Sequence, residues 1–496
     1  MEISFESRET SVYREYSRES RRVQESVECV VPDTDADMEK IASVQSAVFL
    51  KSKDLSARGV LVTGELSASV LYIRDGQTGL SFLRVKKPFS LEFETDCPES
   101  ETLAQVSLLL QGCDVRAVNP RKIAVSFELE GVLRCYRAER LCVEASLPKG
   151  APCLHVKTEA YTLTLPNAVC EKSVAINEQF IFPPESAPER LVSEKAEIRV
   201  SDSQLIGSKI IVKGSAVIAV TALTETGELL SCTFSAPFSQ IVDVGVDSMK
   251  TCTVKPEITG AYLNLIDTIK GEKALDAEVH AVLQLLCCDE TALTCITDVY
   301  SNLCPAELQR RTESFELASA PETRSLRTEE RVSLMEPCAE LLQTFASPIR
   351  LTAQGGRLTA AVNLDFLYRT GDGRLSAARR TIALEEDAGS DALRIVGAGQ
   401  VALSVKADGE NVDCAVELAL ACESLDITVL NFVGGVILDE EKAYVQESLP
   451  TLTLVRRGGE SLWSLAKKYH SSEEKILELN EEAETTTRML LIPKCI

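Results

Sequence analysis

One alternating strand pattern occurs three times in this chain. In the first copy, Val60 to Tyr72, apolar or small residues occupy every second position, while Thr63 and Glu65 lie between them. The pattern returns at Ile210 to Ala222 and at Leu358 to Tyr368. A period of two is typical of a β-strand with one buried face. A spacing of about 150 residues is that of a whole domain, whereas solenoid repeats are shorter. The sequence therefore predicts a domain-sized internal repeat.

Each copy of the strand is followed by a turn and a return strand. The turns are Asp75-Gly76, Thr226-Gly227 and Asp372-Gly373, residue pairs that favour hairpins. The return strands carry Pro88-Phe89 and Pro237-Phe238, and we align Thr381-Ile382 with them in the third copy. The third copy is therefore the most diverged.

Each copy is also preceded by a strand, a proline and a short apolar segment. Met38, Ile41 and Val44 are three residues apart, which predicts a short helix, and Leu191 and Leu341 occupy the corresponding places. The expected fold is mainly β, with three β-sandwich-like repeats that contain a short helix each.

The domain boundaries follow from these patterns. Residues 1–24 are highly charged and are expected to form a solvated arm or a loosely attached first strand. Residues 301–327 lack a clear apolar period and are expected to be a linker. The three repeats are assigned to residues 25–165, 175–300 and 328–430, and a separate module to residues 450–496.

Composition limits the classes of partner. The 496 residues carry a formal net charge of −23, which disfavours nucleic acid and bare anionic membranes. The start of the chain has no apolar core of a secretory signal, and the longest apolar run, Ile427 to Leu438, is too short to span a bilayer. We therefore expect a protein of the cytosol without a membrane segment. The 17 scattered cysteines fit buried thiols in a reducing compartment, with redox or cross-linking use as the alternative.

Catalytic patterns are not found in the sequence. His155, His280 and His470 are far apart, and His155 and His280 fall on polar phases of strands, so we expect surface histidines. There is no C-x-x-C, H-E-x-x-H, P-loop or G-x-S-x-G motif. We expect neither an enzyme nor a bound metal or cofactor.

The repeats resemble a known family. The order strand, proline, short helix and then VTGELSASVLY from Val62, or VKGSAVIAVTA from Val212, is similar to the SPOCS repeat of bacterial spore-coat assembly proteins.

The last 45 or so residues predict a β-α-α-β unit. Leu462, Leu465 and Tyr469 share one helical face, and Ser471-Ser472-Glu473-Glu474 is interpreted as a capping box for a second helix. The run VRRGGESLWSLA from Val455, with Asn480 and LLIP from Leu490, closely resembles a LysM domain. That resemblance implies a small binding groove for N-acetylglucosamine polymers, formed by Gly459, Glu460, Ser461, Leu462, Trp463 and Asn480.

Some positions differ from the LysM pattern. Gly459 replaces an aspartate, His470 a glycine, and Thr487-Arg488 a Gly-Gln pair, so that Arg488 could obstruct a flat sugar. Trp463 either packs the first helix or serves as a groove wall and binding anchor. The cations Arg456, Arg457, Lys467 and Lys468 form either a solvated face or a docking surface.

SPOCS-like repeats followed by one LysM domain resemble the SipL-type coat morphogenetic proteins of spore-formers. The resemblance implies a non-enzymatic scaffold of the endospore coat, located in the mother cell at the forespore surface. Its LysM domain would bind the ATPase that polymerises as the basement layer of the coat, and its β repeats would bind other coat proteins. The alternative is a protein that binds peptidoglycan or N-acetylglucosamine polymers.

Overall fold

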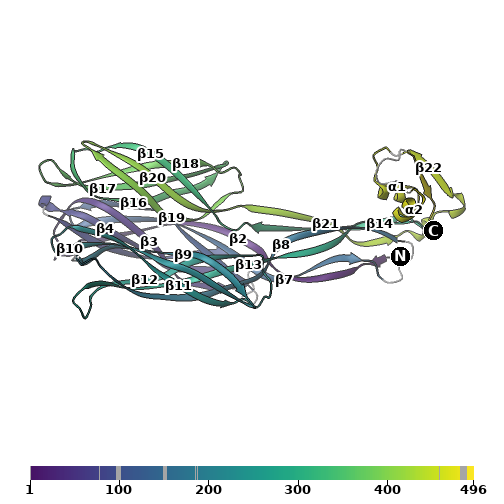
Figure 1. The fold of residues 1–496 in the computed structure, drawn as a ribbon, viewed down its shortest axis with the longest axis horizontal. Coiled ribbons are helices and arrows are strands. Elements are labelled where there is room, and N and C mark those ends of the chain that lie inside the picture. The colour runs from purple at the N-terminus through teal and green to yellow at the C-terminus, as the bar shows by residue number, and fades with distance from the viewer. Residues whose placement is uncertain are drawn as a thin grey trace.

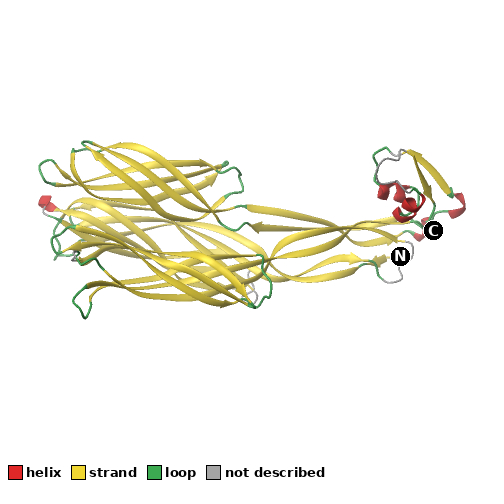
Figure 2. Ribbon diagram, viewed as in Figure 1, coloured by secondary structure: helices red, strands yellow, loops and turns green. Residues whose placement is uncertain are grey.

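The computed structural model describes residues 2–77, 79–95, 102–148, 154–184, 186, 188–456, 458–480 and 489–495. It has three parts along its long axis: a broad bundle of sheets, a narrow stalk and a small terminal module (Figure 1). Helices gather at the end that holds the module, whereas strands form nearly all of the rest (Figure 2). The mainly β class predicted from the sequence is confirmed.

Each repeat is a sandwich of two three-stranded antiparallel sheets. In the first repeat the strand orders are β2-β7-β6 and β3-β4-β5. The second repeat has β12-β13-β8 and β9-β10-β11, and the third has β15-β20-β19 and β16-β17-β18. The three-stranded sheet β1-β21-β14 extends the third repeat into the stalk.

The bounds of these strands are as follows. The first repeat contains β1 (Glu2–Ser4), β2 (Glu6–Val30), β3 (Met38–Ser56), β4 (Gly59–Arg74), β5 (Leu80–Glu94), β6 (Thr102–Asn119) and β7 (Lys122–Ser146). The second contains β8 (Leu154–Ile181), β9 (Pro188–Ile206), β10 (Lys209–Thr224), β11 (Leu229–Asp243), β12 (Thr251–Asp267) and β13 (Lys273–Ser301). The third contains β14 (Ala306–Ala318), β15 (Glu322–Ser333), β16 (Cys338–Gln354), β17 (Arg357–Thr370), β18 (Leu375–Asp387), β19 (Arg394–Asp408), β20 (Asn411–Glu423) and β21 (Leu425–Leu438).

The three predicted alternating strands are the central strands β4, β10 and β17. Their apolar faces close the sandwich cores, as Val62 and Leu66 do in the first repeat against Phe127 of the opposite sheet. The predicted hairpins connect β4 to β5, β10 to β11 and β17 to β18.

A glycine and a phenylalanine face each other across two of these hairpins. Gly64 pairs with Phe89, and a Cβ on Gly64 would lie 2.4 Å from the phenylalanine ring. Gly214 and Phe238 repeat the arrangement at 2.8 Å. In the third repeat the register places Ala360 opposite Leu384. Ala383-Leu384, rather than the predicted Thr381-Ile382, therefore corresponds to the Pro-Phe pair. In all three repeats, a large residue on the return strand faces a small residue on the central strand.

The short helix expected in each repeat is replaced by the bulged start of a strand, which corrects that expectation. Met38, Ile41 and Val44 pair with Arg74, Tyr72 and Val70, every second residue of β4. One extra residue is inserted in each step, so a spacing of three keeps the side chains on one face of the sheet. The same two bulges occur at the start of β9 and of β16. A double bulge thus reproduces the apolar spacing of a helix.

The bulges also join the three repeats. Ala42 and Val192 are inserted residues, both are buried, and they lie in one apolar cluster with Phe345 and the half-buried Leu342 of the third repeat. Leu71 and other residues of the central strands complete this cluster. The three sandwiches therefore meet along a shared core that is separate from their own cores.

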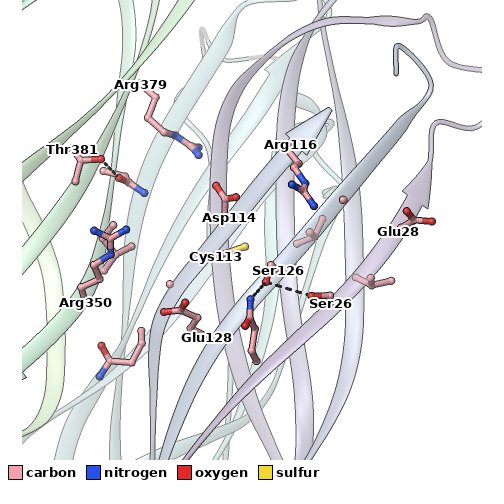
Figure 3. A pocket seen from close by; sticks show the side chains of 18 residues that line it. Ser26, Glu28, Cys113, Asp114, Arg116, Ser126, Glu128, Arg350, Arg379 and Thr381 are labelled. Carbon is pink, nitrogen blue, oxygen red and sulfur yellow. Dashed lines mark hydrogen bonds between the residues drawn. The ribbon is translucent and has the colours of Figure 1, made fainter. Parts of the chain in front are cut away.

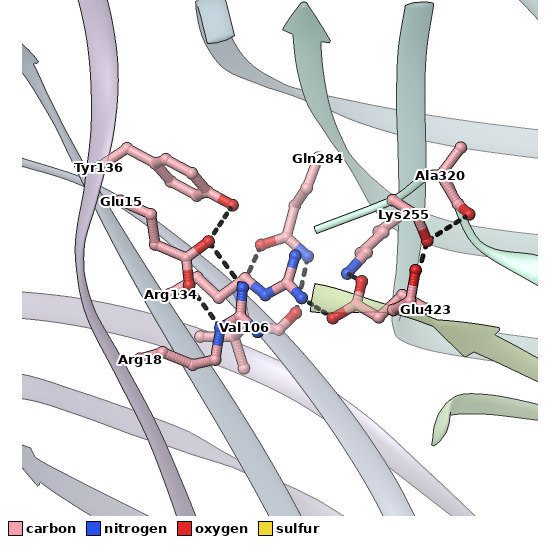
Figure 4. Close-up of polar contacts among 11 residues, drawn as sticks. Glu15, Arg18, Val106, Arg134, Tyr136, Lys255, Gln284, Ala320 and Glu423 are labelled. Carbon is pink, nitrogen blue, oxygen red and sulfur yellow. Dashed lines mark hydrogen bonds and ion pairs between the residues drawn. The ribbon is translucent and has the colours of Figure 1, made fainter. Parts of the chain in front are cut away.

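Buried polar groups form a second junction between the three repeats, near the other end of β3 (Figure 4). Glu423 of the third repeat pairs with Arg134 of the first and, at 3.1 Å, with Lys255 of the second. Burial lowers the pKa of Lys255 to about 7, and the nearby Arg134 contributes in the same direction. The Gln284 amide accepts from Val106 N at 2.8 Å and donates to Val106 O at 2.7 Å, which connects the second repeat to the first.

The stalk consists of three two-stranded ribbons, β2 with β7, β8 with β13, and β14 with β21. Each ribbon contributes to a central apolar core, for example Leu141, Leu293 and Phe432. A second cluster continues the core towards the tip, where β1 pairs with β21 through Glu2 and Ile437.

Two segments with little apolar pattern form strands that lie partly in the stalk and partly in the sandwiches. Most of the predicted charged arm, residues 1–24, forms β1 and β2, and the predicted linker, residues 301–327, contains β14 and the start of β15. A thin stalk buries few side chains per strand, so its sequence is mostly polar. Its charges form ion pairs within and between ribbons: Arg14 pairs with Glu139 of its own ribbon and with Glu313 of the β14 ribbon, at 3.0 Å each.

Candidate functional site

The terminal module folds as β-α-α-β at the tip of the stalk. It consists of β22 (Leu452–Arg456), α1 (Leu462–Lys468), α2 (Glu473–Leu479) and β23 (Met489–Pro493). Ser461 and Ser472 begin the two helices, and their hydroxyls accept from Ser464 N at 3.1 Å and Lys475 N at 3.3 Å. This order of elements confirms the prediction.

The predicted groove residues do not share one environment. Gly459, Glu460 and Ser461 are exposed on the loop before α1, and Leu462 is half-buried. The Asn480 amide donates to Ile476 O and Leu491 O, both at 2.7 Å, and accepts from Leu491 N at 2.9 Å. Asn480 thus ties the end of α2 to β23. The loop that would form the other groove wall, including Thr487 and Arg488, lies outside the described residues, as does Arg457.

Trp463 faces the stalk. It is 8% exposed and packs edge-on against Tyr300 of β13, with ring centroids 4.8 Å apart. Its indole N–H donates to Asp298 Oδ2 at 2.8 Å. Tyr300 therefore belongs to the apolar core of the module although it comes from the second repeat.

Polar contacts surround this aromatic pair. Lys467 Nζ lies 2.8 Å from both carboxylate oxygens of Asp298. The Tyr300 hydroxyl and the Asn302 amide both donate to Ser471 O, at 2.8 and 3.3 Å. Burial alone would raise the pKa of Asp298, but the hydrogen bonds from Lys467 and Trp463 outweigh it and lower that pKa. The module is thus fixed to the stalk by a charged and aromatic joint.

Sequence reasoning did not identify this joint. Asp298 and Tyr300 continue a strand pattern, and nothing local marks them as contacts of a module 160 or so residues later. His155, expected at the surface, is half-buried and stacks on Tyr300 at 4.8 Å. Of the four predicted cations, Arg456, Lys467 and Lys468 are exposed; Lys467 pairs with Asp298, and Lys468 lies 3.9 Å from Glu460.

The opposite side of the module is apolar and open. Leu454 and Leu491 face each other across β22 and β23, and their exposed fractions are 61% and 36%. Leu452 and Met489 extend the same face, with 51% and 46% exposed. We call these four residues the outer leucine face. Val455, Leu490 and Ile492 fill the inner side.

A hollow lies far from the module, between the first and third repeats (Figure 3). It measures about 730 Å³ and is lined by outward side chains of the sheet β2-β7-β6 and by β16 to β18. Arg116, Arg350 and Arg379 bring positive charge, and Glu28, Asp114 and Glu128 balance it. Arg379 is bound to Asp365 at 2.6 Å. The hollow is polar and of mixed charge, and no sequence pattern predicted it.

No set of three or more His, Cys, Asp or Glu side chains in the described ranges is placed to hold a metal ion. Among the same residues, no helix has the length and apolar character needed to cross a bilayer.

The fold defines a modular protein in which repeated β-sandwiches carry a small terminal β-α-α-β module. Residues 188–266, which lie in the second repeat, match the SPOCS domain of the SipL family. Residues 457–490 match the LysM domain. No curated protein and no solved structure matches the chain. The chain thus combines a SipL SPOCS domain with a C-terminal LysM domain, and both are binding domains.

Proposed function

We propose that this protein is a non-enzymatic scaffold of bacterial endospore coat assembly. The observation that carries the proposal is the combination of a SipL SPOCS domain with a LysM domain in one chain. The SipL match supports association with the spore coat at the forespore surface, in the mother cell. In this proposal the LysM domain binds the morphogenetic ATPase of the coat basement, and the repeats bind other coat proteins.

The position and charge of the module support a protein partner. From Thr451 onward the chain has seven Lys and Arg residues and seven Glu residues, so the preceding residues carry the whole charge of −23. The module therefore presents a neutral tip on an acidic stalk, and like-charge repulsion does not oppose docking there. The outer leucine face offers apolar area of the kind that protein interfaces bury.

The alternative is binding of peptidoglycan or other N-acetylglucosamine polymers. The LysM match and the exposed loop of Gly459, Glu460 and Ser461 favour it. Trp463 is a weaker argument for this alternative, because its ring already packs on Tyr300. A sugar that stacked on Trp463 would have to displace the stalk.

Titration calorimetry of the full chain distinguishes the two functions. We expect heat from the purified coat-basement ATPase and none from N-acetylglucosamine oligomers. Leu454→Glu on the outer leucine face should abolish the ATPase heat, whereas Glu460→Ala on the groove loop should leave it unchanged. Sugar binding that is weakened by Glu460→Ala, without ATPase binding, would establish the glycan function instead.

A further inference from the structure

Two cysteines of the second repeat face each other directly. Cys252 on β12 is the register partner of Cys287 on β13, and their sulfur atoms are 3.7 Å apart. The cysteines among the described residues are all free thiols. Most of them fit the expectation of small buried hydrophobic residues, for example Cys135 and Cys414 in the cores of the first and third repeats. The pair on β12 and β13 differs because a second thiol is within reach.

The geometry suits a disulfide bond. Directly opposed residues of antiparallel strands have Cβ atoms about 4.5–5.5 Å apart, and a disulfide joins Cβ atoms separated by about 3.5–4.5 Å. The ranges meet at about 4.5 Å, so a small approach of the two strands, together with rotation of the side chains, brings the sulfur atoms into bonding distance. Both side chains belong to the core of the second repeat.

The two thiols differ in access and acidity. Cys287 is fully buried, whereas Cys252 is partly exposed. The Cys287 thiol donates a hydrogen bond to Cys252 Sγ, which lowers the pKa of Cys252. The same bond, together with burial, raises the pKa of Cys287. Cys252 is thus the accessible nucleophile, and Cys287 is the thiol that completes the bond.

We propose that Cys252 and Cys287 are a thiol–disulfide exchange site that takes low-molecular-weight disulfides such as oxidised glutathione. The Cys252 thiolate attacks one sulfur of the small disulfide, forms a mixed disulfide and releases one thiolate. Cys287 then loses its proton and attacks Cys252 Sγ, which releases the second thiolate. Two protein thiols are oxidised and one small disulfide is reduced to two thiols.

The bond would close the open end of a long hairpin. Cys252 lies at the start of β12, and the turn that joins β12 to β13 lies at the other end. A cross-link there encloses the whole hairpin and restricts the unfolded chain. The oxidised second repeat should therefore resist unfolding more than the reduced one.

Peptide mass mapping of the folded full chain tests the proposal. After incubation with oxidised glutathione and digestion without reductant, we expect peptides joined through Cys252 and Cys287, lighter by two hydrogens. Cys287→Ser should leave one glutathione on Cys252, and Cys252→Ser should leave Cys287 unmodified. Cys170→Ser is the matched control, since Cys170 lies in the same core and should not affect the link.

The denaturant midpoint provides a second measurement. It should rise on oxidation of the unmodified chain and of Cys170→Ser, and stay constant in Cys252→Ser. A folded protein in which Cys252 remains open to alkylation after the treatment would overturn the proposal. So would a link between Cys170 and Cys287.

Discussion

The Trp463 indole of the terminal module donates a hydrogen bond to Asp298, a residue of the second repeat, across 2.8 Å. The same carboxylate binds Lys467. One aspartate of the stalk therefore holds both an aromatic and a cationic side chain of helix α1, and fixes the LysM domain at the tip.

Asp298→Asn should loosen this joint. The amide loses its charge, so the Lys467 pair is broken and the Trp463 bond is weakened, at a cost of about 1–3 kcal/mol. Because Trp463 is the single tryptophan, its fluorescence should shift to the red as water reaches the ring. Asp426→Asn, at an exposed position of the stalk strand β21, is the control. An unchanged spectrum in Asp298→Asn would show that Tyr300 alone holds the module.

The Gly64 and Phe89 pair should behave as a coupled unit. Gly64→Ala places a methyl group 2.4 Å from both the Phe89 ring and the Phe49 carbonyl, and should cost about 1–3 kcal/mol. Phe89→Leu alone leaves a cavity. The double variant copies the Ala360 and Leu384 pair. In it, Phe89→Leu should reduce the free energy of unfolding by less than it does in the otherwise unmodified protein. Urea unfolding of the four proteins gives the coupling energy, and additive costs would contradict this account.

Glu257 should make stability depend on pH. Burial raises the pKa of its carboxyl from 4.5 to about 8. The folded protein therefore retains a proton that the unfolded chain releases, so this contribution is complete below pH 4.5 and is lost as the pH rises towards 8. Between pH 4.5 and 8, the free energy of unfolding should therefore decrease by roughly 1–3 kcal/mol less in Glu257→Gln than in the unmodified protein.

The control for this experiment is Glu272→Gln, an exposed glutamate on the turn before β13. Lys255, whose lowered pKa is about 7, acts with the opposite sign at higher pH. Measurements from pH 4.5 to 6 therefore avoid Lys255, and the difference between Glu257→Gln and Glu272→Gln cancels groups that both variants share, such as Glu194, whose pKa burial also raises. A pH dependence that is identical in Glu257→Gln and the unmodified protein would contradict the prediction.

Local pattern was enough to predict the sandwich strands and the LysM order. The strand β4 buries one face along its whole length, so its period of two is visible in the sequence. The bulged start of β3 was misread, because two inserted residues turn that period into three. A hydrophobic pattern shows the spacing of buried residues, and two different backbones can share that spacing.

The contacts between distant segments could not be predicted in this way. Asp298 and Trp463 each look ordinary in their own segment, and only the stalk brings them together. The same holds for Arg134, Lys255 and Glu423, one from each repeat. Sequence reasoning assigned the six candidate groove residues to the terminal module, where their role stays a prediction, and it could not tell which side of the module faces the stalk.

The pairing of β1 with β21 has a consequence for synthesis of the chain. Glu2 leaves the ribosome well before its partner Ile437, which emerges only after nearly the whole third repeat has been translated. Until then, the two ribbons that are translated earlier lack the β14-β21 ribbon that completes the stalk core, so Leu141 and Leu293 remain exposed to water. The stalk is therefore completed after the sandwiches of the first two repeats. A ribosome that stops within the third repeat releases a chain whose ribbons have exposed apolar faces and strand edges and are prone to aggregate.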